Sequence, residues 1–192
     1  MLRLCWFDTP CTTFSSVQNM RKGGPLRSPT FPWGVSGLPP HQHAAVLAGN
    51  TFLRFTCSML AICRRMRIPS FVENPHASGL WRNPLMQKVL AWKEVQQHVT
   101  DYCQFSMPWR KRTRVLSMFC DLNRSVAMCR GTCGKCSCTG LPHVRLMGRV
   151  AGQGDRTKLA EPYPKQWCSA LVFDMIVSLR NEELAPIIKG FC

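Results

Sequence analysis

Glycine and proline crowd the segment between residues 16 and 45, and this crowding is the strongest constraint on what the chain can fold into. The segment holds these nine residues: Gly23, Gly24, Pro25, Pro29, Pro32, Gly34, Gly37, Pro39 and Pro40. Glycine and proline interrupt helices and strands, so one regular element cannot cover the segment. Loops of this length inside a compact domain are uncommon, and are usually functional or disordered. We therefore predict a long loop over residues 16–45.

Regular elements of alternating kind are predicted on either side of this loop. Apolar runs predict strands at residues 2–7, 70–72, 99–105 and 114–119, and periodic apolar positions predict helices over about 50–66, 84–92 and 164–179. Strands that alternate with helices are typical of an α/β fold. We divide the chain into residues 1–119, a Cys-rich loop over 120–148, and a segment over 149–192 that contains a hairpin and the C-terminal helix.

Two reactive side chains follow predicted strands. Cys11 lies in PCTTFS, just after the first strand, and Glu73 lies in FVENP, after the second. In open α/β sheets, ligands bind outside the carboxyl ends of the strands, so both side chains are candidates for one site. Each also has a plain structural interpretation: free cysteine is among the most buried residue types, and a glutamate before Asn-Pro can simply end a strand.

The charge of the chain is strongly positive. It has 25 Lys and Arg against 10 Asp and Glu, a formal net charge of +15, and basic residues stand beside an aromatic in WRKRTR, residues 109–114. Such a charge favours nucleic acid as the partner, and Arg110, Lys111 and Arg112 are candidates for phosphate contact. The other interpretation is a solvated basic face or an anionic lipid surface.

Twelve cysteines restrict the cellular location. They would suggest disulfides in a secreted protein, but MLRLCWFDTP lacks the apolar core of a signal peptide, so we expect reduced thiols and an intracellular, nuclear protein. No run approaches the ~20 apolar residues of a membrane span, so no membrane partner is expected.

The Cys-rich loop contains a candidate metal site. In MCRGTCGKCSCTGLPH the sulfur and imidazole groups are dense enough to supply four zinc ligands, and we predict Cys129, Cys133, Cys136 and His143. The alternative is a loop of free thiols, because the second, well-separated pair of an ordinary zinc finger is lacking.

Several short stretches together resemble the cytosine-5 DNA methyltransferases. PCTTFS is similar to the proline-cysteine loop of that family, FVENP to its glutamate-asparagine turn, and DYCQFSMPWRKRTRVLSMF to its later segment with an Arg-x-Arg pair. Methyltransferase-like domains found with protist retroelements resemble the chain more closely, through PCTTFS, GPLRSPTFPWG, AGNTF, ENPHASGLW, WRKRTR and CSCTGLPH in order. The resemblance covers about residues 5–119 and implies an incomplete Rossmann-like, class I methyltransferase-like sheet.

The resemblance also implies roles for these residues. The Cys11 thiolate would add to carbon 6 of a cytosine that has left the stack, and Glu73 would hydrogen-bond or protonate ring nitrogen 3. Arg112 or Arg114 would polarise the exocyclic carbonyl. The Cys-rich loop would fall where the family inserts its DNA-recognition region.

The cofactor of the family is S-adenosylmethionine, held by a Gly-rich loop that precedes the proline-cysteine loop. Only ten residues precede Cys11 here, so we expect the cofactor half to be missing or to come from another chain, and no methyl transfer by this chain alone. The GQG at residues 152–154 lacks a clear strand before it and a helix straight after it, and is poor support for a substitute.

Two functions stay open on the sequence. One is a partial or degenerate DNA cytosine-5 methyltransferase-like domain. The other is a non-catalytic, retroelement-derived module that binds nucleic acid through WRKRTR and a zinc-binding Cys-rich loop. A third interpretation, Asp8-Thr-Pro-Cys as the Asp-Pro-Pro-aromatic loop of amino-methyltransferases, puts cysteine where the stacking aromatic belongs and leaves Glu73 without a role.

Overall fold

The computed structural model describes residues 4–15, 24–150, 152 and 154–189. The architecture is mixed α/β, and its main sheet has four strands in the order β1-β2-β4-β3: β1 (Cys5–Asp8), β2 (Ser70–Pro75), β4 (Arg112–Met118) and β3 (Val95–Asp101). The chain forms two compact units, the first from Met1–Gln97 with Arg114–Phe119 and the second from His98–Thr113 with Cys120–Cys192. The segment 98–113, which we grouped with the N-terminal part, thus belongs to the second unit.

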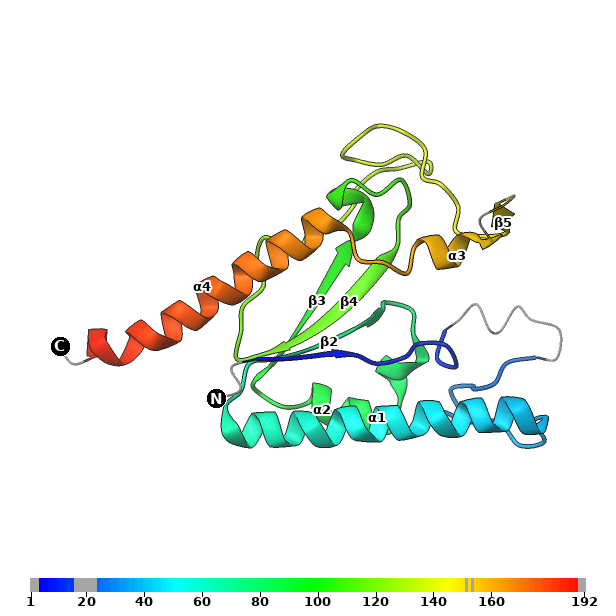
Figure 1. The fold of residues 1–192 in the computed structure, drawn as a ribbon, viewed down its shortest axis with the longest axis horizontal. Coiled ribbons are helices and arrows are strands. Elements are labelled where there is room, and N and C mark those ends of the chain that lie inside the picture. Colours follow the sequence, from blue (N-terminus) through cyan, green and yellow to red (C-terminus); the bar gives the residue numbers. More distant parts are fainter. Residues whose placement is uncertain (1–3, 16–23, 151, 153, 190–192) are drawn as a thin grey trace. The chain divides into compact units, whose positions relative to one another are not determined.

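In the first unit β1 and β2 are parallel neighbours. Their register pairs Cys5 with Ser70 and Asp8 with Glu73. The connection between them contains α1 (Pro40–Met66), and β2 is followed by a 3-10 turn, η2 (Gly79–Arg82), and by α2 (Pro84–Leu90). Both helices lie on the same side of β1 and β2 (Figure 1). Two parallel strands need such a crossover connection, which is why a helix follows β1 and precedes β2 along the chain.

Helix α1 begins ten residues earlier than the breakers suggested. Its first residue is Pro40, after Pro39 at the N-cap, so the predicted start at about residue 50 is wrong. Proline is well tolerated in the first turn because the N–H that it lacks would have no helical partner there. The helix ends as predicted before Pro69, with Arg67 in the left-handed region at φ 54°.

Helix α1 also meets the length and composition criteria for a membrane span. One of its faces nevertheless contributes to the core of the first unit, through Leu53, Cys57, Leu60 and Cys63. Core helices of water-soluble proteins pass the same criteria, so this feature by itself assigns no membrane to the chain.

The core of the first unit is built by its helices and strands. Its buried apolar side chains include Phe14, Leu53, Leu60, Val72, Leu80, Trp81, Met86, Leu116 and Met118. Burying one such side chain contributes ~1.5–3 kcal/mol. The largest of them also satisfies its polar atom, because the indole N–H of Trp81 donates to the Pro75 carbonyl over 2.9 Å.

The other predicted elements are found with shifted ends. The predicted strand over 99–105 ends at Asp101, and a 3-10 turn, η3 (Tyr102–Phe105), follows it. The predicted hairpin is β5 (Arg149–Val150) with β6 (Gly154–Asp155), before the short α3 (Arg156–Leu159). The last helix is α4 (Lys165–Lys189), longer than predicted. Residues 2–3 of the first predicted strand, 16–23 of the loop and Gln153 of GQG lie outside the described residues.

The second unit packs α4 against η3. The Trp167 ring lies with its centroid 5.3 Å from that of Tyr102, and its indole N–H donates to the Ser125 carbonyl over 3.0 Å. Two helix turns later, the buried carboxylate of Asp174 accepts hydrogen bonds from three successive backbone N–H groups, those of residues 123–125. These contacts fix the first residues of the Cys-rich loop, just after β4.

A glycine inside α1 gives a first test of the packing. Gly49→Ala should lower the free energy of unfolding by about 1 kcal/mol, because overpacking costs ~1–3 kcal/mol and the helix propensity of alanine returns only about 1. The added Cβ would lie 2.6 Å from Thr13 Oγ1 and 3.0 Å from Arg27 Nη2. Urea denaturation measures the change. Ala48→Gly, at the exposed neighbouring position, is the control for propensity alone; a stabilised Gly49→Ala would contradict the packing.

Candidate functional site

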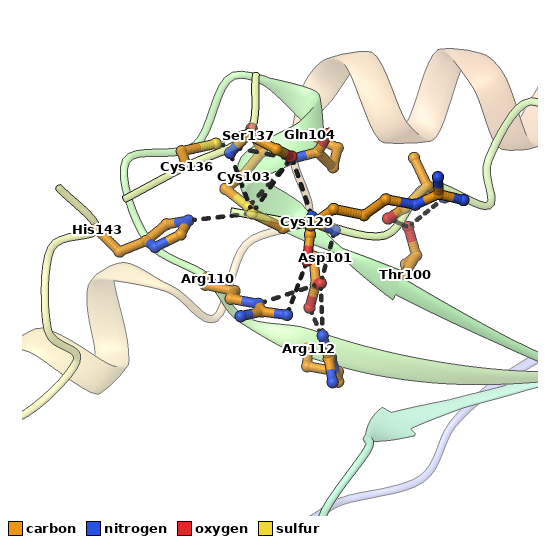
Figure 2. A network of polar contacts seen from close by, with 12 residues as sticks. Thr100, Asp101, Cys103, Gln104, Arg110, Arg112, Cys129, Cys136, Ser137 and His143 are labelled. Atoms are coloured by element: carbon orange, nitrogen blue, oxygen red, sulfur yellow. Dashed lines mark hydrogen bonds and ion pairs between the residues drawn. The ribbon is translucent and has the colours of Figure 1, made fainter. Parts of the chain in front are cut away.

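Four soft ligands meet in the second unit. The Sγ atoms of Cys103, Cys129 and Cys136 and one ring nitrogen of His143 all lie within 4.8 Å of one another, and the three cysteines are buried. Figure 2 shows these side chains converging from η3 and from the Cys-rich loop. A Cys3His group of this kind could hold a metal ion such as zinc.

The spacing of the ligand atoms fits zinc. Zinc bonds of about 2.3 Å to sulfur and about 2.0–2.1 Å to nitrogen place an S and an N ligand about 3.6 Å apart at a tetrahedral centre. The distance from Cys129 Sγ to His143 Nε2 is 3.6 Å. The two atoms therefore already stand as they would around the ion.

The histidine is held in the tautomer that a metal needs. His143 Nδ1 lies 2.9 Å from the carbonyl oxygen of Gly134. A carbonyl only accepts, so Nδ1 carries the hydrogen and Nε2, the atom that faces Cys129, keeps a free lone pair. A hydrogen bond from the far ring nitrogen to a backbone carbonyl is the usual support of a metal-bound histidine.

The local backbone prepares Cys129 to ionise. Burial opposes its thiolate, but hydrogen bonds from the N–H and the hydroxyl of Ser137 and from the N–H of Gly131 outweigh burial and lower the pKa of Cys129 from 9.0 to about 6. The Ser137 nitrogen lies 3.4 Å from Cys129 Sγ. Since metals bind the thiolate, such N–H donors support a metal ligand.

The other two thiols differ in the direction of their pKa shifts. Burial opposes ionisation of Cys136, but the N–H groups of Cys138 and Thr139 lower the pKa of its thiol. Burial raises the pKa of the Cys103 thiol to about 12, so without a cation this group keeps its proton. The amide of Gln104 approaches both sulfurs, at 3.5 Å from Cys103 and 3.6 Å from Cys136. A bound dication would ionise all three thiols.

Cys133 does not belong to the cluster, and this corrects one predicted ligand. It is exposed, with φ 51°, in a turn that closes with a hydrogen bond from Lys135 N to Thr132 O. This turn is followed by Gly134, also at positive φ, and carries Cys133 away from the group. Cys103 takes its place. The spacing of the cysteines within the loop gives no sign of Cys103, which lies 26 residues before Cys129. The one available signal is the rule that zinc ligands often come from separated segments, which indicates a ligand outside the loop.

A glycine makes the tight turn of the loop possible. A Cβ on Gly131 would lie 1.9 Å from the Lys135 carbonyl oxygen and 2.7 Å from the Ser137 nitrogen. The backbone of residues 135–137 thus passes where any other residue would have its side chain. This close approach brings the Ser137 N–H to Cys129.

Asp101 binds Arg110 and Arg112, the two arginines that we expected to contact nucleic acid. Its carboxylate is fully buried and accepts from Arg112 Nε and Nη2, each over 2.9 Å, and from Arg110 Nε over 3.2 Å. It also accepts from the Cys129 N–H over 2.9 Å, while Arg110 Nη2 donates to the Cys129 carbonyl. Figure 2 shows this network next to the cluster. The predicted roles of Arg110 and Arg112 toward phosphate or base stay predictions, and two nitrogens of each guanidinium already donate within the fold.

The ionisation of Asp101 follows from the same contacts. Burial alone would raise its pKa, but the hydrogen bonds from Arg112 and the Cys129 N–H, with the charges of both arginines, hold the pKa below its ordinary 3.8. A lowered folded-state pKa means that the carboxylate stabilises the fold above the unfolded pKa. That contribution is lost as the pH falls through the folded value.

Lys111, the third predicted phosphate contact, donates to the Ala160 carbonyl over 3.0 Å.

The first unit holds the other predicted residues. The parallel register places Asp8 opposite Glu73, and Cys11 follows Asp8 by three residues, so both groups lie at the carboxyl-end edge of β1 and β2. Cys11 begins a turn in which its carbonyl accepts from the N–H groups of Phe14 and Ser15. Glu73 itself is inside β2 and only 4% exposed.

The turn around Cys11 is anchored on both sides. Asn74, next to Glu73, donates from Nδ2 to the Thr9 carbonyl over 2.7 Å, and the Thr9 hydroxyl hydrogen-bonds that of Thr56 on α1 over 2.8 Å. The ENP stretch and α1 thus fix the backbone just before Pro10 and Cys11.

Of the two candidate arginines, Arg114 lies in the same unit as Glu73. Its guanidinium contacts His76 Nδ1 at 3.4 Å and Gln97 Oε1 at 3.3 Å, and lies over the Trp81 ring. His76 follows Glu73 by three residues. Arg112, in contrast, is in the second unit with Asp101.

No family model, curated protein or solved structure significantly matches the chain.

Metal content tests the composition of the cluster. Purified under reducing conditions, the protein should carry about one zinc, and Cys103→Ser should lose it, because a hydroxyl replaces a thiolate poorly as a zinc ligand. Cys133→Ser removes a thiol from the same loop but should keep the zinc. Elemental analysis of the three proteins measures this. Zinc retained by Cys103→Ser and lost by Cys133→Ser would restore the ligand set predicted from spacing.

Replacing Asp101 tests the network that supports the cluster. Asp101→Asn should lower the free energy of unfolding by about 3–5 kcal/mol, since it leaves two arginines without their carboxylate. Zinc affinity should fall by about 10–100-fold, as for other groups that orient metal ligands. Urea denaturation at pH 7 and competition with a chelator measure the two effects. The control is Glu161→Gln, an exposed carboxylate of the same unit, which should change neither.

Proposed function

We propose that this chain is a methyltransferase-like, nucleic-acid-binding domain that holds one pyrimidine between Cys11 and Glu73, and that its main sheet is part of a Rossmann-like, class I methyltransferase-like sheet. The observation that carries the proposal is the parallel register of β1 and β2. It brings the Cys11 thiol and the buried Glu73 carboxyl group to one sheet edge, where the hydrogen bond from Asn74 to Thr9 joins the two segments. Ligands of open α/β sheets bind at that edge.

The chemistry of these groups suits an unstacked cytosine. The Cys11 thiolate adds to carbon 6, the electron pair moves into the ring, and Glu73 stabilises the charge by a hydrogen bond or a proton at nitrogen 3. Arg114 is the arginine we propose for the exocyclic carbonyl, because it contacts His76 just after the ENP stretch. S-adenosylmethionine would be bound by a cofactor half that another chain supplies.

The Cys-rich loop is proposed as a zinc-held surface for the nucleic-acid backbone. Three of its basic side chains, Arg130, Lys135 and Arg145, are exposed, whereas Arg110 and Arg112 are bound to Asp101. A metal would fix the loop that carries these cations, so that they meet phosphates in one arrangement.

Covalent trapping tests the pyrimidine site. Single-stranded DNA with one 5-azacytosine should form an adduct without a methyl donor, because ring nitrogen 5 takes up a proton after the thiolate adds to carbon 6. The adduct appears as a shifted band on a denaturing gel. Cys11→Ala should abolish it, and Cys133→Ser, which removes an exposed thiol elsewhere, should not. An adduct that survives Cys11→Ala would refute the assignment of Cys11.

The second candidate is a non-catalytic module that binds nucleic acid. The observation that favours it is the set of exposed cations on the metal-binding loop, which needs no reactive thiol. Absence of any adduct together with salt-dependent DNA binding would select this function.

Salt dependence locates the backbone contacts for either candidate. Replacing Arg130, Lys135 and Arg145 by Ala should reduce the slope of log K against log salt by about two to three, since each lost phosphate contact removes about one released counterion. Fluorescence anisotropy with a DNA oligonucleotide measures the slope. The control is Arg65→Ala with Arg67→Ala, two exposed cations on or just after α1. An unchanged slope would mean that the loop does not face the backbone.

A further inference from the structure

A small pocket in the first unit has no role in the proposal above. Its volume is about 160 Å³, and its lining includes two arginines and three hydroxyl side chains, Arg27, Arg82, Thr13, Ser15 and Ser28. No carboxylate is among the described residues that line it. A cavity of about 150 Å³ accepts a molecule the size of benzene, so this pocket has room for one tetrahedral oxyanion.

Arg27 is a buried cation whose partners are all neutral. It is 9% exposed, and its nitrogens donate to Thr13, to the carbonyls of Pro32 and Val46, and to Asn50 Oδ1 over 2.7 Å. In the described part of the chain no carboxylate forms an ion pair with it. Buried charges are usually paired, so an anion in the adjoining pocket would supply the missing opposite charge. Burial lowers the pKa of Arg27 to about 10, which still leaves it charged at neutral pH.

The surroundings of Arg27 are built for it. Gly49 leaves the space that its Nη2 and the Thr13 hydroxyl occupy, and the Phe14 ring lies 3.9 Å from its guanidinium carbon. Asn50 is itself fixed, because its Nδ2 donates to the Trp33 carbonyl over 2.9 Å. The charge is therefore held in one place beside the pocket, without the freedom of a surface side chain.

The remaining lining groups can donate to an anion. Arg82 is exposed and lines the pocket, so a second cation is present beside Arg27. Ser28 Oγ accepts from the Phe31 N–H over 3.0 Å, which leaves its hydroxyl hydrogen to donate. Arginine and hydroxyl donors around a tetrahedral anion are a usual phosphate site.

We propose that this pocket binds a phosphate group, with Arg82 and Ser28 as donors and Arg27 as the buried opposite charge. Free phosphate, a phosphate monoester and the backbone of a nucleic acid share this chemistry. The site does not depend on Cys11: phosphate can bind whether or not a pyrimidine is held.

Calorimetric titration with inorganic phosphate, at constant ionic strength with chloride as the background anion, tests the pocket. The protein should bind about one phosphate, and Arg82→Gln should raise the Kd at least tenfold, equal to about 1.4 kcal/mol. Arg65→Gln removes the same charge from an exposed site on α1 and should leave the Kd within twofold. Ser28→Ala should raise the Kd without loss of charge. No saturable binding, or equal effects of Arg82→Gln and Arg65→Gln, would overturn the proposal.

A second titration identifies the source of the phosphate. If a nucleic-acid backbone occupies the pocket, Arg82→Gln but not Arg65→Gln weakens oligonucleotide binding, and inorganic phosphate competes with the oligonucleotide. If oligonucleotide binding is unchanged while phosphate binding is lost, the pocket serves a small phosphate. Both results support the site. Trapping through Cys11 reports separately on the proposed function, so failure of one does not hide the other.

Discussion

The buried carboxylate of Asp101 is the interaction on which the second unit depends. Asp101 ends β3, and its two oxygens bind Arg110 and Arg112, which stand before and at the start of β4, and the backbone of Cys129. The end of β3, the start of β4 and the backbone of Cys129 therefore meet at one side chain. With two arginines and an N–H around it the charge is well compensated, whereas an isolated buried carboxylate would be very costly. The metal-ligand cluster takes its position from this arrangement, because Cys129 is both a ligand and a partner of Asp101.

Much of the fold could be predicted, but most of the element ends could not. The apolar runs located β1, β2 and β4, since a short apolar run between turn residues has few other structures. The start of α1 was missed because Pro39 and Pro40 look like the end of a loop, while proline fits the first turn of a helix equally well. Gly49 is inside the helix, where its missing side chain leaves room for Thr13 and Arg27. Tertiary contacts of this kind leave no local signal.

The residues of the candidate sites also fall into those that the sequence could predict and those that it could not. Cys129, Cys136 and His143 could be found from spacing because a tight loop brings neighbours in sequence together, whereas Cys103 needs the path of η3. Sequence could place Cys11 and Glu73 at one edge, since parallel strands determine it. It could not show that the WRKRTR cluster is tied to Asp101, because charge in a sequence does not reveal its partner. Nor could it show that GPLRS, AGN and PCTT meet at Arg27, which contacts Thr13 and Asn50.

The distance along the chain between Cys103 and Cys129 has a consequence for the order of folding. The separation is 129 − 103 = 26 residues, and closing a loop of that length costs about 3 kcal/mol of chain entropy by the logarithmic rule. Cys129, Cys136 and His143 are close in sequence and can capture an ion while the rest of the unit is still open. Cys103 then joins only when β3, η3 and β4 have formed. An ion held first by three ligands would gain its fourth ligand only when the unit has folded. It would then act as a cross-link that forms late in folding, much as a late disulfide does.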